Sequence, residues 1–283
     1  MIDDVVKKYL ENSHTFKQKK ILFKNKKYIS YYHGRELCFK TNDSWLSIKG
    51  TGWNYGPPNA YTTKNDFNCL GLLNYENAKR EKKISNILNR KYSKKFSNFL
   101  ELIKFNRKDI DKIKNFLPKA FVPSLIIREV SSPYRLNDLY LKNKKKAFNS
   151  FKYYFGSNKK IAISKLQMKV LNTVINYHLK GYLHDMLDLG NINTHGQILD
   201  LEYFYIPNIK YPKYFKVSKK VLNNRKEKEA IYFLEIIYQI SETLNEKTTL
   251  RKLANKSLEM LETHDKYKHL IFYKTLKKLR VNF

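Results

Sequence analysis

The sequence keeps its β-rich segments apart from its helical ones, and this segregation limits the fold more than any other feature. Short runs of β-branched and aromatic residues lie between residues 20 and 49, and turn-forming residues divide them. The second half instead carries apolar residues three and four apart, as amphipathic helices do. Strands gathered before helices predict an α+β chain with an N-terminal antiparallel sheet and a mainly helical C-terminal part.

The same patterns predict where the individual elements lie. Strands are expected at 21–23, 28–32, 36–39 and 45–49, and helices at 74–88, 97–116, 163–179, 226–244, 247–261 and 265–280. The apolar run 121–130 fits a buried strand or a connector between lobes, and 142–146 fits an exposed loop. We place a domain boundary between residues 122 and 123, which divides the chain into 1–122 and 123–283.

The chain is strongly basic. Its 56 Lys and Arg residues outweigh 25 Asp and Glu residues, which gives a formal net charge of +31. Such a charge is typical of proteins that bind nucleic acids or anionic surfaces. However, only nine of the basic residues are Arg, the residue that reads bases best, and the Lys residues are scattered along the sequence. We therefore favour a solvated basic surface over a nucleic-acid partner.

Cysteine content and hydropathy indicate the compartment. Cys38 and Cys69 are too few for a disulfide framework or for a zinc site of four cysteines. The first twelve residues lack the apolar core of a signal peptide, and no eighteen apolar residues run together. We expect a cytoplasmic protein with no membrane segment.

A candidate metal site lies late in the sequence. Asn191 falls in a polar loop after a helix, and Asp200 follows a short strand beyond a hairpin turn at 194–197. An amide oxygen and a carboxylate that meet across a hairpin suit Mg²⁺, whose remaining ligands would be phosphate oxygens and water. The alternative is structural: Asn191 caps a turn and Asp200 ends a strand.

A candidate phosphate site lies early in the sequence. Lys49 ends a predicted strand and precedes Gly50, Thr51 and Gly52, so a cation and accessible backbone N–H groups would lie together. Glu81, on the predicted helix 74–88, can pair with Lys49 and orient it, as kinases do with their Lys–Glu pair.

Taken in order, these motifs resemble the SelO (YdiU) family. Segments of this chain are similar to the family's Gly-Arg strand, its Lys-Gly-x-Gly loop, its Arg-Glu helix, its two arginines seven residues apart and its His-led metal loop. In this sequence they are HGRELCFK (33–40), WLSIKGTG (45–52), REKKISNIL (80–88), IIREVSSPYRL (126–136) and LHDMLDLGNINTHGQILDLEYF (183–204).

The resemblance implies a two-lobed protein-kinase-like fold that binds ATP in a flipped orientation and transfers AMP to protein hydroxyl groups. Residues 1–122 would bind the nucleotide, and 123–283 would carry the metal loop. ATP and Mg²⁺ would be the cofactors, and the partner would be a protein with a Ser, Thr or Tyr hydroxyl. When the family's site residues are carried over to this chain, Lys49, Gly50 and Gly52 would lie at the phosphates, and Glu81 would orient Lys49. Arg128 and Arg135 would neutralise the polyphosphate. Asn191 and Asp200 would hold the metal.

One departure bears on catalysis. The family's general base is an Asp directly before the metal-binding Asn, but this chain has Gly190 there. We assign the role to Asp188, with Asp185 as the alternative. The same fold could instead serve a phosphotransferase or a catalytically degenerate nucleotide-binding pseudokinase.

Other residues have two readings. Glu202 replaces a family glycine and fits a second metal ligand or a solvated turn, of which we favour the turn. His184 and His195 lack a companion ligand for a transition metal, so we expect His184 to support the loop backbone. Trp53 and Tyr55 fit adenine stacking or packing, and we favour packing.

Overall fold

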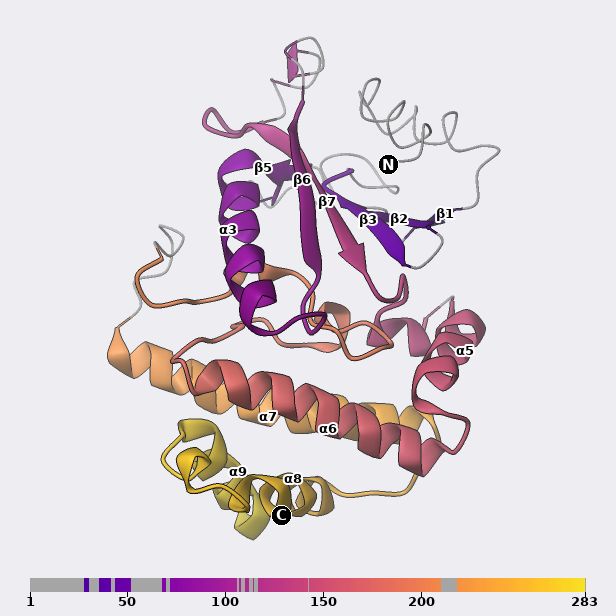
Figure 1. The fold of residues 1–283 in the computed structure, drawn as a ribbon, viewed down its shortest axis with the longest axis vertical. Helices are drawn as coiled ribbons and strands as arrows, with labels where there is room; N and C mark the ends of the chain where they lie inside the picture. Colours follow the sequence, from indigo (N-terminus) through magenta and orange to yellow (C-terminus); the bar gives the residue numbers. More distant parts are fainter. Residues whose placement is uncertain are drawn as a thin grey trace. The chain divides into compact units, whose positions relative to one another are not determined.

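The computed structural model describes residues 28–30, 36–41, 44–51, 68–69, 72–105, 107, 110–111, 114, 117–141, 143–209 and 218–282. By its contacts the chain divides into two compact units (Figure 1). The first lies within residues 1–91 and 97–133, and the second comprises 92–96 and 134–283. This division lies beyond the boundary expected at residue 122, because the apolar run 121–130 contains a strand that pairs within the first unit.

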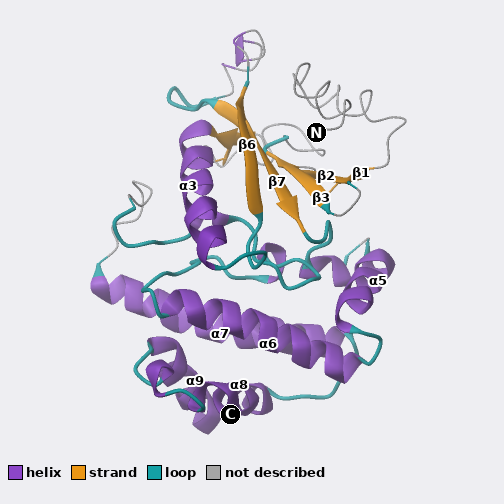
Figure 2. Cartoon of the chain, viewed as in Figure 1, coloured by secondary structure: helices purple, strands orange, loops and turns teal. Residues whose placement is uncertain are grey.

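An antiparallel sheet organises the first unit (Figure 2). Its strands are β1 (Tyr28–Ser30), β2 (Glu36–Lys40), β3 (Trp45–Lys49), β4 (Asn68–Cys69), β5 (Leu72–Asn74), β6 (Asn98–Lys104) and β7 (Pro123–Val130). The order is β1-β2-β3-β7-β5-β4, and β6 also pairs with β7. Strand β7 is therefore central, and it is buried along almost its whole length. The strand reading of the run 121–130 is confirmed.

The two faces of β2, β3 and β7 differ in chemistry because successive side chains of a strand point to opposite faces. One face carries an apolar cluster of Leu37, Phe39, Leu46, Ile48, Leu125 and Ile127. The other face carries Glu36, Ser47, Lys49 and Arg128, all buried. Helix α3 (Tyr75–Lys91) covers this second face, where its Ala78 packs with Ile126 of β7.

The helix expected at 97–116 is wrong over its first part, which forms strand β6. Its residues pair with β7 from Asn98 opposite Glu129 to Lys104 opposite Ser124, with an irregularity between Phe99 and Glu101. The helical spacing of apolar residues was misleading because β7 is buried and its backbone N–H and C=O groups need partners, which β6 supplies.

The second unit is mainly helical. It contains α5 (Lys144–Phe155), α6 (Lys159–His178), α7 (Lys219–Thr243), α8 (Leu250–Glu262) and α9 (Ile271–Asn282). The four helices expected in this region are confirmed, with shifted ends, but α5 was missed. Lys144, Lys145 and Lys146 are exposed as expected, yet they begin a helix that buries Ala147, Phe151 and Phe155 at a spacing of four.

Both units together confirm the α+β class, with the antiparallel sheet first and the helical part second. None of the helices in the described ranges combines the length and the apolar character that crossing a bilayer requires.

Candidate functional site

The first unit brings together the expected lysine and glutamate. Lys49 ends β3 and Glu81 lies in α3, and Lys49 Nζ donates a hydrogen bond to Glu81 Oε2 at 3.2 Å. Only 2% of each side chain is exposed. Glu81 points at the sheet because it shares a helix face with the buried Ala78, Ile84 and Leu88. A strand lysine held by a glutamate of the next helix is the arrangement that kinases use at ATP phosphates.

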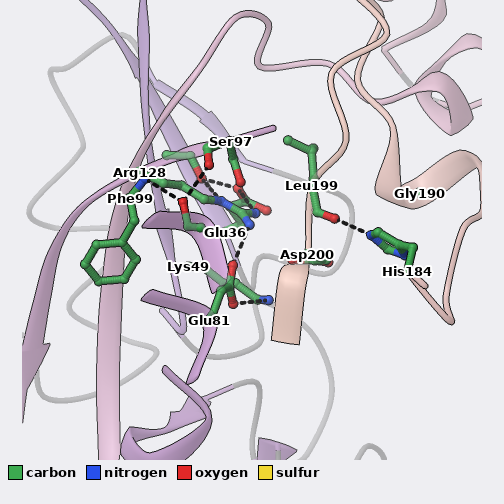
Figure 3. A network of polar contacts seen from close by, with 12 residues as sticks. Glu36, Lys49, Glu81, Ser97, Phe99, Arg128, His184, Gly190, Leu199 and Asp200 are labelled. Atoms are coloured by element: carbon green, nitrogen blue, oxygen red, sulfur yellow. Dashed lines mark hydrogen bonds and ion pairs between the residues drawn. The ribbon is translucent and has the colours of Figure 1, made fainter. Parts of the chain in front are cut away.

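Arg128 joins this pair instead of lying apart from it (Figure 3). Its Nη1 donates to Glu81 Oε1 at 3.1 Å, its Nη2 to Glu36 Oε1 at 2.8 Å, and its Nε to Ser47 Oγ at 3.2 Å. The Ser47 hydroxyl in turn donates to Glu36. The family resemblance implies that Arg128 lies at the polyphosphate, and the sequence analysis missed Glu36 altogether. Protein groups surround the Arg128 guanidinium in the structure, and only 1% of the residue's surface is exposed.

Gly50 follows Lys49 in a backbone conformation that requires glycine. Its φ is +92°, and a Cβ added there would lie 2.6 Å from the carbonyl oxygen of Ser124 and 3.0 Å from Leu73 Cβ. Any side chain would therefore push β3 away from its neighbours at the point where Lys49 is held. Gly52, Trp53 and Tyr55 lie outside the described residues.

In the second unit, the expected hairpin holds Asn191 and the residue before Asp200 opposite each other. Ile192 and Ile198 form an antiparallel bridge, and the Leu199 N–H donates to the carbonyl of Asn191 at 2.8 Å. The side-chain amide of Asn191 donates to the carbonyl of Met186 at 2.7 Å, which leaves its Oδ1 as the atom for a cation. Asp200 follows at a φ of +52°, in the left-handed region.

Arg135 ties the two ends of this hairpin together. Its Nη1 donates to the carbonyl of Gly190 at 2.5 Å and to Asp200 Oδ2 at 3.3 Å. Its own backbone N–H donates to Asp138 Oδ2 at 2.7 Å, which fixes the start of the turn Leu136–Leu139. Arg135 thus places a positive charge beside the expected metal-binding carboxylate.

Asp188 lies in the space beside Gly190. A Cβ added to Gly190 would be 3.1 Å from Asp188 Oδ1. Asp188 is accessible, yet the partial burial of its carboxyl raises the pKa above the ordinary value, and the charge of Asp200 adds to this. The pKa is lowered in part by His184 and by backbone hydrogen bonds of Gly190 and Asn191.

The alternative base, Asp185, is engaged elsewhere. Its Oδ2 pairs with Arg225 Nη1 of α7, and only 10% of its side chain is exposed. Its φ of +71° also fixes it in the left-handed region. Of the two acids, Asp188 is the more exposed residue.

His184 supports the loop backbone, as expected. It is fully buried, and its Nε2 lies 2.8 Å from the carbonyl oxygen of Leu199, the residue before Asp200 (Figure 3). Its backbone N–H donates to Glu229 Oε1 of α7 at 3.2 Å. Glu229 also accepts from the Tyr177 hydroxyl and lies 2.9 Å from His178 Nε2. The sequence did not reveal Glu229, because its partners are distant in the chain.

Burial overturns one further expectation. Glu202 is only 3% exposed, so the favoured solvated turn is wrong: the residue lies in a short helical turn, Leu201–Tyr203, that faces inward.

His195 stacks on Tyr154 with ring centroids 4.5 Å apart, and its Nε2 lies 3.1 Å from Ser150 Oγ. Burial lowers the pKa of His195 to about 4, with help from the Lys169 charge.

The donor chemistry of the hairpin suits a hard cation. Among the described residues, no three His, Cys, Asp or Glu side chains gather as metal ligands. The amide oxygen of Asn191 and the carboxylate of Asp200 are donors that Mg²⁺ accepts when phosphate oxygens and water complete its shell.

Comparisons with known proteins give no family. No family model matches the chain, and no curated protein matches it. One similar solved structure is a Stt7 homolog from Micromonas algae soaked with ATP, with 10% identity and a TM-score of 0.44, covering 73% of this chain. This chain spans 65% of that one. Another is a Toxoplasma gondii specific rhoptry antigen kinase domain, with 13% identity and a TM-score of 0.42. The match covers 84% of this chain and 75% of that one.

Proposed function

We propose that the protein is an ATP- and Mg²⁺-dependent nucleotidyltransferase that passes AMP to a hydroxyl group of a protein. The buried Lys49–Glu81 pair carries the nucleotide-binding part of this proposal, because a lysine held in this way is suited to contact phosphate. The SelO-like order of the sequence motifs carries the choice of AMP. The acceptor would be a Ser, Thr or Tyr hydroxyl of a partner protein, and no nucleic acid is required.

The geometry of each unit supports the proposed binding roles. Lys49, next to the tight backbone of Gly50, would contact the phosphates. Asn191 Oδ1 and the Asp200 carboxylate would hold Mg²⁺, which supplies charge neutralisation at the phosphates. Arg135, already paired with Asp200, would add positive charge on the same side of the hairpin.

The reactive role falls to Asp188. The acceptor hydroxyl oxygen would bond to the α-phosphorus while the bond from that phosphorus to the bridging oxygen breaks and pyrophosphate leaves. Asp188 would take the hydroxyl proton. Its raised pKa makes it a stronger base than an ordinary Asp, and its carboxyl lies beside Gly190, where the family's base would begin.

The test uses ATP labelled at either the α or the γ phosphorus, with Mg²⁺ and the purified protein. Label that enters only from the α position supports AMP transfer. Label from the γ position alone would make the protein a kinase, and label from neither position, together with no ATP binding, would make it a pseudokinase without nucleotide.

Matched variants show whether the site is responsible. Asp200→Ala should abolish incorporation because it removes a metal ligand. Asp265→Ala removes an exposed acid that pairs only locally with Lys268, and it should leave incorporation unchanged. Equal incorporation by both variants would contradict the assigned site.

A further inference from the structure

We propose that Glu36 and Arg128 are positioning residues for the Lys49–Glu81 pair, and that Arg128 acts through Glu81 without touching the nucleotide. The inference rests on the proposed function in one respect, since it takes Lys49 as a phosphate-binding residue. It assigns a role to Glu36 and gives Arg128 a different role from the one that the sequence motifs imply.

Strand register gathers the four charges. In the β2–β3 ladder Glu36 lies opposite Lys49, and in the β3–β7 ladder Ser47 lies opposite Arg128. Because side chains two residues apart share a face, these residues point to the side of the sheet that α3 covers. Glu81 enters from that helix.

The cluster divides its contacts in a regular way. Glu81 accepts from Lys49 at Oε2 and from Arg128 at Oε1, so two cations hold one carboxylate. Arg128 donates from Nη1 to Glu81 and from Nη2 to Glu36, so two carboxylates hold one guanidinium. The described ion pairs therefore link Glu36 to Arg128, Arg128 to Glu81, and Glu81 to Lys49.

The formal charges of the four residues cancel, and each residue is at most 2% exposed. In a site this dry, loss of one charge leaves an opposite charge that is poorly solvated. If Glu36 became neutral, Glu81 would be the one charged carboxylate left in this set for both Arg128 and Lys49. Arg128 would then compete with Lys49 for Glu81, and the Lys49 ammonium would lose its fixed position.

The two possible roles of Arg128 predict opposite effects of Glu36→Gln. If Arg128 binds phosphate directly, neutralising Glu36 frees the guanidinium, and ATP affinity should stay the same or rise. If Arg128 positions Glu81, the same change should lower the rate of AMP transfer by about 10- to 100-fold. Losses of this size are common when a residue that orients a metal ligand is replaced. ATP affinity should change less than the rate.

The experiment compares Glu36→Gln, Arg128→Met and the double variant in transfer rate and in ATP affinity, with exposed Glu101→Gln of β6 as the control. We expect the double variant to transfer no more slowly than the worse single variant, because both residues act through Glu81. Tighter ATP binding by Glu36→Gln, a wild-type rate, or fully additive losses would overturn the proposal.

A double variant with apolar replacements, Glu36→Leu combined with Arg128→Met, serves as the control for misfolding. Replacing a buried ion pair by apolar residues commonly preserves the fold. We expect this variant to melt cooperatively and still transfer slowly. If the variant folds and transfers at the wild-type rate, Lys49 needs no help from Glu36 and Arg128, and the proposal fails.

A readout that needs no transfer separates this proposal from the proposed function. The chain has nine arginines, so the Arg128 Nε–H signal can be assigned by NMR from the Arg128→Met spectrum. The α,β-methylene analogue of ATP, added with Mg²⁺, should leave this signal protected from solvent exchange, and Glu36→Gln should shift it. A signal that moves strongly with the analogue but not with Glu36→Gln would overturn the positioning role, even in a protein that transfers nothing.

Discussion

Asp188 is the single residue whose replacement tests the proposed chemistry most directly. Asp188→Asn should slow AMP transfer by about 100-fold, within the range that a general base contributes. It should not lower the melting temperature, because partial burial raises the pKa of Asp188 and the folded state thus disfavours its charged form. Initial rates and thermal unfolding of the same preparation check both statements.

An exchange of two residues serves as the control for Asp188. Asp188→Gly combined with Gly190→Asp should recover part of the activity that Asp188→Gly alone loses, because a side chain at 190 begins 3.1 Å from the present Asp188 carboxyl. Wild-type transfer by Asp188→Asn would show that another group takes the proton.

His195 should make stability depend on pH. Its pKa falls from 6.5 to about 4 on folding, chiefly through burial, so the unfolded chain binds a proton more readily between these values. The free energy of unfolding should therefore fall as the pH drops from about 6.5 toward 4, by up to about 3 kcal/mol. Urea titrations across this window measure the slope.

His195→Gln should flatten that slope, whereas the same change at the exposed His269 should leave it in place. An unchanged slope in His195→Gln would mean that stacking on Tyr154 and the contact with Ser150 do not keep His195 neutral.

Of the glycines that the structure describes, Gly50 at the end of β3 leaves the least room for a side chain. Gly50→Ala should destabilise the protein by about 2–4 kcal/mol, because it adds a clash with Ser124 to an unfavourable φ. Gly156→Ala, at the end of α5, is the matched control. Its φ of +102° and ψ of 166° are also unfavourable for alanine, but the space around its Cβ is open, so this change lacks the clash and should cost only about 1–2 kcal/mol. Equal losses, measured by urea unfolding, would show that the close approach at Gly50 does not matter.

Helices α6 and α7 and the loop that contains His184 meet at Glu229. Glu229→Gln should cost about 3 kcal/mol of unfolding free energy, because a buried carboxylate that serves Tyr177, His178 and the His184 backbone loses its charge. Glu227→Gln, at a less buried position of the same helix, should cost less than about 0.5 kcal/mol. Equal melting temperatures for the two variants would contradict the role of Glu229.

Local patterns predicted the elements whose partners lie close in the sequence. The strands at 36–39 and 45–49 and the helix that carries Glu81 were predicted, since turn residues and apolar spacing act within a few residues. Strand β6 was missed because its partner β7 lies about twenty residues further on, and pairing with it outweighs helical spacing. Helix α5 was missed because it begins with three lysines and has no side-chain cap.

The candidate site shows the same limit. The Lys49–Glu81 contact and the hairpin between Asn191 and Asp200 follow from motifs. The pairing of Glu36 with Arg128 joins residues 92 apart and left no motif. One signal was present: Glu36 begins an otherwise apolar strand segment beside buried strands, where a lone acid needs a cation.

For the whole molecule, the charge of +31 predicts how the protein treats DNA. Any binding to a short duplex should be independent of sequence and should fall at least about 100-fold between 50 and 200 mM salt, because phosphate contacts release counterions. Fluorescence anisotropy with two unrelated duplexes measures this. Affinity that survives 200 mM salt and differs between the duplexes would contradict the solvated-surface interpretation.

The position of the Asp188 carboxyl beside Gly190 bears on how related chains are found. A search pattern that demands an acid directly before the asparagine proposed to bind the metal passes over this chain. A pattern that also accepts the acid two residues earlier, with glycine next to the asparagine, would retain it. Under the proposed function, a chain that carries the second pattern would be a candidate for assay even where it lacks the first.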